Sequence, residues 1–208
     1  MRSTDGDTFT ERARRRQLVG CAIDAIAELG FAQASVRKIA ERGGVAMSVV
    51  LYHFGNKDEL VAAVVSECYR TLLEAMVPAV GAESTAIGKL AAHIRTHLQY
   101  MQTHRAHQIA IMEISQGFRG RDGARLADVA IDAEHRDGLA AVDLEVIFRL
   151  GVDTGEFRSV SVESMATAVR GSIGAALLRV TAQPDFDLTD YGTDLIEAFT
   201  RACAPDPR

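Results

Sequence analysis

Four histidines gather in one short stretch, and they are the side chains best suited to metal chemistry in this sequence. His93, His97, His104 and His107 would span only about 80° of a continuous helix at 100° per residue. Imidazoles one helical turn apart can share Zn²⁺ or Cu²⁺. However, residues 103–105 (Thr-His-Arg) indicate a helix junction, and no cysteine or carboxylate lies in matching register. We therefore expect no metal site here, and interpret the histidines as a solvated face or the edge of a pocket.

Signatures of the common enzyme classes are missing from the sequence. It contains no GxSxG, P-loop, GxGxxG or HExxH pattern, and Cys68 has no evident histidine partner. Each of these patterns places a nucleophile, a phosphate or a metal ligand, so their absence argues against hydrolysis, nucleotide chemistry and zinc catalysis. We expect a protein that is not an enzyme, with no catalytic residue and no cofactor.

The most informative stretch is residues 35–60, which reads as two short helices around a glycine turn, followed by the start of a third. Ser35 can cap a helix that ends at Gly43-Gly44, because glycine readily adopts the left-handed conformation of a helix end. A second helix over residues 47–54 would bury Val50 and Phe54. Asn56 then caps the next helix, with Glu59 in capping-box position. Helix, glycine turn and second helix are the parts of a helix-turn-helix, whose second helix enters a DNA major groove.

Residues 12–62 resemble the DNA-binding domain of the tetracycline-repressor (TetR) family. The matching runs are ELGF at 28–31, SVRKIAERGGV at 35–45 and YHFGNKDEL at 52–60. These runs keep several fixed spacings over about 50 residues, so the resemblance is specific. The rest of the chain is similar to the family only in its helical pattern and its length.

The resemblance implies which residues would contact DNA. Arg37 is the best candidate for a base contact, since arginine reads guanine through two hydrogen bonds. Lys57, with the first amides of its helix, would bind a phosphate, and an arginine-rich start would reach the DNA backbone or minor groove. The full predicted set is Arg14, Arg15, Arg37, Met47, Ser48, Val49, Tyr52, His53 and Lys57.

Three positions depart from the pattern of the family. Leu51 stands where relatives commonly have a tyrosine that contacts phosphate, Ala46 replaces the usual serine or threonine cap of the second helix, and Met47 replaces a frequent lysine. These departures leave open a second reading, in which the fold is retained but binds another protein instead of DNA.

We expect an all-α fold of about nine helices in two domains. Residues 1–60 would form the three-helix DNA-binding domain, with a flexible basic arm over 1–16, and residues 61–208 a larger helical domain for ligand binding and dimerisation. Among its helices, one from Lys57 would end before Pro78, and one would run over about 124–150.

The charge of the chain divides unevenly. The net charge is −5, yet residues 1–60 hold nine Lys/Arg against eight Asp/Glu, so the acidic excess lies in the C-terminal part. No run of 18 apolar residues indicates a membrane helix. Three widely spaced cysteines are typical of reduced thiols. The expected location is cytoplasmic, with no membrane partner.

The C-terminal part contains candidate pocket and interface residues. Glu113 lies within an apolar run, where it would either partner an arginine or face a ligand. The predicted pocket set is His97, Met101, Met112, Glu113 and Phe148. Apolar stripes in the last two helices predict a four-helix dimer interface, or else the core of the single chain. The predicted interface set is Val169, Ile173, Ala176, Val180, Leu195 and Phe199.

Taken with the resemblance, these features predict a ligand-responsive transcriptional regulator, most simply a repressor. As a homodimer it would place two recognition helices about 34–36 Å apart on a palindromic operator in double-stranded DNA. A small-molecule effector in the C-terminal domain would displace the helix that begins near Lys57 and so release the DNA.

Overall fold

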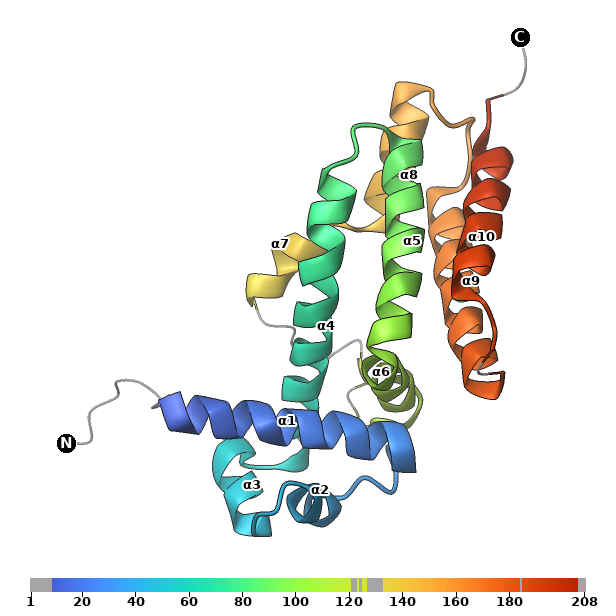
Figure 1. The fold of residues 1–208 in the computed structure, drawn as a ribbon. Helices are drawn as coiled ribbons and strands as arrows, with labels where there is room; N and C mark the ends of the chain where they lie inside the picture. The colour runs from blue at the N-terminus through green and yellow to red at the C-terminus, as the bar shows by residue number, and fades with distance from the viewer. Residues whose placement is uncertain (1–8, 121–122, 124, 127–132, 184, 206–208) are drawn as a thin grey trace, which may run out of the picture. The chain divides into compact units, whose positions relative to one another are not determined.

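The computed structural model describes residues 9–120, 123, 125–126, 133–183 and 185–205, and in that part it has ten α-helices and no strand (Figure 1). The expected all-α fold is confirmed. The helices are α1 (Phe9–Leu29), α2 (Val36–Arg42), α3 (Met47–Phe54), α4 (Lys57–Gly81), α5 (Ala86–Thr103), α6 (Arg105–Gly117), α7 (Ala133–Ala141), α8 (Leu144–Thr154), α9 (Val162–Ala182) and α10 (Leu188–Cys203).

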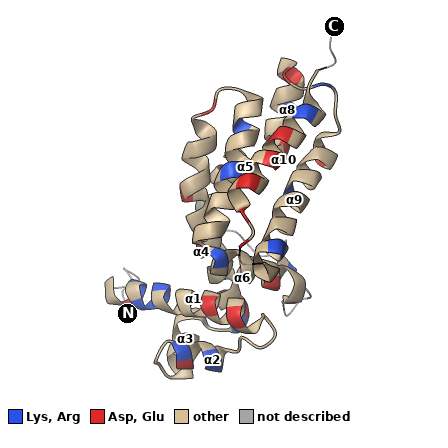
Figure 2. Cartoon of the chain, turned by 45° about the vertical axis from the view of Figure 1, so that its right-hand side comes forward, with Lys and Arg blue, Asp and Glu red and all other residues tan. Residues whose placement is uncertain are grey.

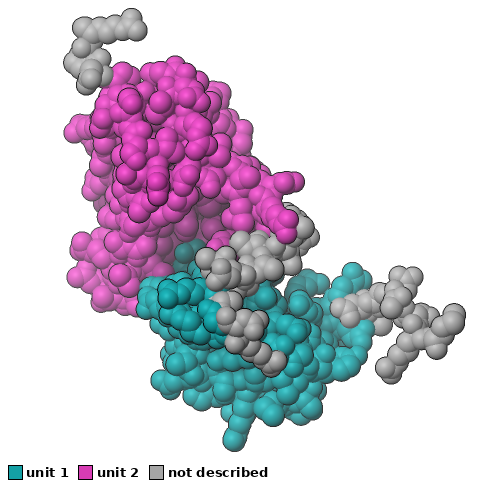
Figure 3. All heavy atoms as spheres, turned by 180° about the vertical axis from the view of Figure 1, so that it is seen from behind, with its two compact units in different colours: residues 1–68, 106–131 teal, residues 69–105, 132–208 magenta. Residues whose placement is uncertain are grey.

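The chain divides into two compact units, coloured separately in Figure 3. The first combines residues 1–68 with 106–131, and the second combines 69–105 with 132–208. Residues 106–117 of α6 therefore belong with the helix-turn-helix, although they come about fifty residues after it in the sequence. Within the described residues, no helix is long and apolar enough to cross a bilayer.

In the first unit, α1 lies across α2 and α3 (Figure 1), and the three helices bury Leu18, Ile26, Ile39 and Phe54. The predicted helix ends are confirmed. Ser35 Oγ accepts a hydrogen bond from Lys38 N at 3.3 Å, and Gly43 ends α2, followed by Gly44 at φ +65°. At the start of α4, Asn56 Oδ1 accepts from Glu59 N and Asn56 Nδ2 donates to Glu59 Oε1.

Helix α1 corrects the expected flexible arm over residues 9–16. It begins at Phe9, so Arg12, Arg14, Arg15 and Arg16 stand on a continuous helix that carries on into the core of the unit. Residues 1–8 of the predicted arm lie outside the described part. The basic groups are therefore held at the spacing of helix turns.

Helix α4 also differs from its prediction, since it continues through Pro78 to Gly81. Proline removes one N–H, whose acceptor would have been the carbonyl of Glu74. Both residues lie on the exposed side of the helix, where water can bond to that carbonyl. The missing hydrogen bond is therefore tolerated in the last turns.

The helix predicted over 124–150 is two helices where the structure describes it. Helix α7 ends at Ala141, and Asp143 starts α8 by accepting a hydrogen bond from Glu145 N at 2.6 Å. The rest of the predicted span, at 124 and 127–132, lies outside the described residues. Glycine often marks a turn, but Gly151 lies inside α8, where an added Cβ would be 2.1 Å from the ring of Phe157.

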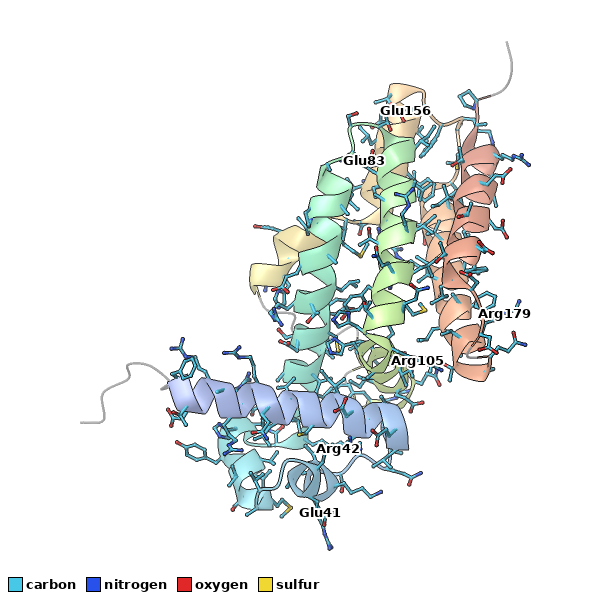
Figure 4. The ribbon with its side chains drawn as sticks, viewed as in Figure 1. Glu41, Arg42, Glu83, Arg105, Glu156 and Arg179 are labelled. Carbon is cyan, nitrogen blue, oxygen red and sulfur yellow. The ribbon has the colours of Figure 1, made fainter. Side chains whose placement is uncertain are left out.

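In the second unit, α5 packs against α8, α9 and α10. Leu90, Ile94 and Leu98 of α5 are buried there with Phe148 of α8. Polar contacts secure both ends of the packing (Figure 4): Glu156 after α8 accepts from Ile87 N at 3.2 Å, and Arg105 donates to the carbonyl of Val180 at 2.9 Å.

Candidate nucleic-acid interface and effector cavity

Helix α3 buries one side and presents the other, as a helix that enters a groove must do. Val50 and Phe54 are buried, whereas Met47 is 50% exposed and Tyr52 is 74% exposed. Ser48, which follows Met47 at the start of the helix, is exposed as well. The predicted contact residues Val49 and His53 are half-buried beside this face. The arrangement offers one hydroxyl and several apolar groups to a partner at the helix start.

The start of α3 has no side-chain cap, as the alanine at position 46 led us to expect. Ala46 has φ −70° and ψ 149°, close to the −82° and 156° of Ser35, which does cap α2. The backbone is therefore already arranged for a capping hydroxyl that Ala46 does not supply.

Three predicted arginines lie on α1 and α2 within the first unit. Arg37 is exposed, with 80% of its side chain accessible, and its Nε lies 2.8 Å from Glu41 Oε1. Arg14 donates to Gln17 at 2.7 Å, and Arg15 lies 4.8 Å above the ring of Phe54. Since a guanidinium has five N–H donors, each of these contacts leaves donors for a partner. Figure 2 shows basic groups on the N-terminal half of α1 and acidic groups on its C-terminal half.

Arg42 is a structural residue that the sequence patterns did not single out. Its guanidinium forms a two-pronged pair with the carboxylate of Glu28 on α1, with Asp24 at 3.9 Å; Figure 4 labels Arg42 at the end of α2. The hydrogen bond to Glu28 raises the pKa of Arg42. This pair links α2 to α1, whereas the ion pair of Arg37 with Glu41 lies within α2.

Lys57 contacts the turn after α1. Its Nζ lies 3.4 Å from the carbonyl oxygen of Phe31 and 4.4 Å above the Phe31 ring, and burial lowers the pKa of this lysine. The predicted phosphate contact of Lys57 stays a prediction, and it competes with this intramolecular one. Sequence alone carries no signal for it, because it depends on where the turn at Gly30 places the chain.

The same turn corrects the expectation for Glu113 on α6. Instead of an arginine or a ligand, Glu113 Oε2 accepts a hydrogen bond from the backbone N–H of Phe31 at 3.1 Å. Phe118 meets Phe31 edge to face at 6.0 Å between ring centroids, and a Cβ on Gly117 would lie 2.9 Å from Phe31. We call Phe31, Lys57, Glu113, Gly117 and Phe118 the Phe31 corner.

The second unit contains a cavity of about 450 Å³, within the range of small-molecule sites. Side chains from α4, α5, α7, α8 and α9 line it, and most are apolar. Examples are Leu72, Leu73, Met76, Leu144 and Ile173, while the polar ones include His93, His97, Asp143 and Arg170.

Of the five predicted pocket residues, the structure brings His97 to this cavity. Met101 and Phe148 are enclosed by their neighbours in the core of the unit and keep almost no surface for a ligand. Met112 and Glu113 belong to the first unit. Apolar periodicity identified buried positions but could not tell a filled core from a cavity wall.

His93 is a polar residue of the cavity that was absent from the predicted pocket set. It is 8% exposed, and its Nδ1 lies 3.0 Å from the carbonyl oxygen of Val142. Burial, followed by the nearby His97, lowers the pKa of His93 to about 3. The expected helix junction at residue 104 is confirmed, since α5 ends at Thr103 and His104 stacks on Tyr100.

The predicted interface residues on α9 pack against other residues of the same chain. Val169, Ile173, Ala176 and Val180 are all buried in the second unit, so they have little surface left for a partner. Leu195 and Phe199 of α10 are half-buried. The opposite side of α9 is open, and there Gly171, Gly174 and Ala175 are exposed beside Leu178, at 58%.

Residues 20–64 match the family described as bacterial regulatory proteins, tetR family. The chain therefore contains a TetR-family domain over these residues. The match covers both helices of the helix-turn-helix and the first turns of α4, which confirms the resemblance stated on the sequence runs.

Two curated relatives illustrate what the sequence shares with known regulators. A fatty acid metabolism regulator protein of Bacillus subtilis is 30% identical over 102 residues, covering 49% of this chain and 52% of that protein. The regulator BetI of Stenotrophomonas maltophilia is 38% identical over 66 residues, covering 32% of this chain and 34% of that protein. The chain thus spans about half, or less, of the length of these relatives.

Solved structures extend the likeness of the fold to nearly the whole chain. FadR of Bacillus subtilis in complex with stearoyl-CoA superposes with a TM-score of 0.74 at 23% identity, covering 89% of this chain and 97% of that one. The ketosteroid regulator KstR2 of Mycobacterium tuberculosis gives 0.72 at 17% identity, covering 93% and 96%. At these identities the likeness concerns the fold.

Proposed function

We propose that the protein is a ligand-responsive transcriptional repressor that binds a palindromic operator as a homodimer and is released by a small-molecule effector. The observation that carries the proposal is the exposed face of α3, mounted on a helix-turn-helix of the TetR family. Its site of action is the cytoplasm, where the operator is. The named relatives and neighbours are regulators, and no enzymatic role is proposed.

The cavity of the second unit supports the effector part of the proposal. Helix α4 contributes Tyr69, Leu72, Leu73 and Met76 to the cavity, and the same helix begins at Lys57 beside the helix-turn-helix. A ligand that shifts α4 would therefore act on one continuous element. To move the protein from 1% to 99% released, the effector must favour the released form by about 5.5 kcal/mol.

An apolar effector agrees with the cavity wall. The neighbouring FadR structure holds stearoyl-CoA, and Leu72, Leu73, Met76 and Ile173 would accept a hydrocarbon chain such as its acyl part. Burial of apolar surface would then supply most of the binding free energy.

The test is selection of bound sequences from random duplex DNA with the purified protein and its Arg37→Ala variant. We expect a palindromic site, with affinity reduced by about 1–3 kcal/mol and specificity relaxed in the variant. Arg201→Ala is a matched control, because Arg201 is also 80% exposed and also pairs with a glutamate four residues away. It should bind DNA as the unaltered protein does.

Failure to enrich any sequence at low salt would overturn the repressor proposal for the free protein. The exposed apolar groups Met47 and Leu51 and the uncapped start of α3 would then favour the second candidate, a module that binds another protein. Salt separates the two. For each phosphate that a protein neutralises, log K falls by about 0.9 per tenfold rise in salt, whereas binding through apolar burial is insensitive to salt.

A further inference from the structure

We infer that the cavity of the second unit recognises a neutral, largely apolar effector through a hydroxyl or N–H group that donates a hydrogen bond to Nε2 of His93. This inference rests on the proposed function, since it names the chemical class of the effector. It is carried by the geometry of one buried imidazole and by the charges around it.

The first step is the tautomer of His93. Nδ1 lies 3.0 Å from the carbonyl oxygen of Val142. A carbonyl oxygen only accepts hydrogen bonds, so Nδ1 carries the proton and donates it. Burial keeps the ring neutral, since it lowers the pKa of His93 to about 3. In a neutral imidazole with a proton on Nδ1, Nε2 is an acceptor.

The second step is the position of Nε2. Across the described residues, no fully buried side-chain nitrogen or oxygen lacks a hydrogen-bond partner. The hydrogen bond of the His93 side chain is the one from Nδ1. Nε2 therefore has access to open space, and since His93 is 8% exposed and lines the cavity, that space is the cavity.

The third step is the charge of the wall. Arg170 is the guanidinium of the lining, and it already faces two carboxylates, Asp143 at 3.5 Å and Glu145 at 3.7 Å. Its positive charge is thus compensated where a ligand would meet it. An anionic ligand would have to displace these partners, whereas a neutral one leaves the pairs intact.

Most of the remaining wall is hydrocarbon, although Tyr69 and His97 also line it. Leu73, Met76, Leu144 and Ile173 line the same cavity as the imidazole with side chains that cannot donate or accept hydrogen bonds. A buried acceptor in such a wall discriminates between ligands, because a ligand without a donor leaves the acceptor without a hydrogen bond, which costs free energy. A ligand with a hydroxyl or N–H group at this point forms a hydrogen bond to Nε2. A ligand with only an ether or carbonyl oxygen there places its own lone pair against the lone pair of Nε2.

The experiment compares two isomers that differ only in donor capacity. Dissociation constants of n-octanol and heptyl methyl ether are measured by calorimetry on the full chain, with octanoate as a third probe. We expect the alcohol to bind roughly two- to tenfold more tightly than the ether, the worth of one neutral hydrogen bond. Octanoate should bind more weakly than the alcohol.

The variant is His93→Asn. The asparagine amide can still donate to the carbonyl of Val142, but it offers no acceptor at the position of Nε2. The preference for the alcohol should disappear in this variant and persist in the matched control His104→Asn, since His104 lies at the end of α5 and stacks on Tyr100. If His93→Asn does not fold, the ¹⁵N resonance of His93 Nε2 in the unaltered protein gives the answer: it should shift with n-octanol and not with the ether.

Equal affinity for alcohol and ether overturns the inference, as does tighter binding of octanoate or no binding of any probe. These measurements use no DNA, so the two proposals fail separately. A protein that selects an operator but shows no alcohol preference refutes only the effector class. A protein that binds the alcohol through His93 but selects no DNA refutes only the repressor.

Discussion

Replacement of Glu113 should loosen the Phe31 corner by an amount that the structure sets. The carboxylate accepts a half-buried hydrogen bond from the backbone N–H of Phe31 at 3.1 Å. Hydrogen bonds to charged groups contribute about 1.5–3 kcal/mol, and partial access of water places this one near the lower end. Glu113→Ala should therefore cost about 1.5 kcal/mol. Glu113→Gln keeps an uncharged acceptor and should cost about half as much.

Amide hydrogen exchange followed by NMR is the assay, because it reports on Phe31 itself rather than on the whole chain. A local destabilisation of about 1.4 kcal/mol lowers the protection of an amide about tenfold. Glu156→Ala is the matched control: Glu156 also accepts from a backbone N–H, that of Ile87 at 3.2 Å, but in an exposed position. The protection of Ile87 should change less than about threefold in that variant. Unchanged protection of Phe31 in Glu113→Ala would refute this account of the corner.

Three further predictions concern single positions. Ala46→Ser should stabilise the chain by about 0.5–2 kcal/mol by capping α3, and Ala46→Val should not; thermal unfolding compares them. The pKa of His93 is about 3 when folded and near 6.5 when unfolded, so the unfolded chain takes up the proton first as pH falls. The free energy of unfolding should drop by about 2 kcal/mol between pH 7.5 and pH 5, and His93→Asn should lack this contribution in urea titrations. Gly151→Ala should cost about 1–3 kcal/mol through the ring of Phe157, unlike Gly20→Ala, where the space is open.

Local chemistry made the helix-turn-helix predictable from the sequence. Ser35, Gly43 and Asn56 act through backbone groups within four residues of themselves, so their types and spacing carry the information. The exposed side of α3 followed from periodicity in the same way. For these elements the structure gives the distances of contacts that the sequence already predicted.

The parts that could not be predicted depend on residues far apart in the chain. Gly151 reads as a turn signal, but it is kept small by the ring of Phe157. Glu113 reads as a pocket or ion-pair residue, but its partner lies in a turn that no pattern links to it. His97 was found at the cavity because it belongs to the histidine cluster that we interpreted as a solvated face or a pocket edge, whereas the walls from α4 and α7–α9 share no sequence signature.

The order in which the chain is synthesised gives the Phe31 corner a further consequence. Phe31 and Glu113 are separated by 82 residues, which a ribosome takes roughly 4–16 s to add at about 5–20 residues per second. During that interval the helix-turn-helix has all of its own residues but lacks the partners that α6 supplies. The turn at Phe31 therefore lacks its hydrogen bond to Glu113 until α6 has been synthesised. A pause in translation between these two residues would prolong the time for which the newly made helix-turn-helix lacks this contact.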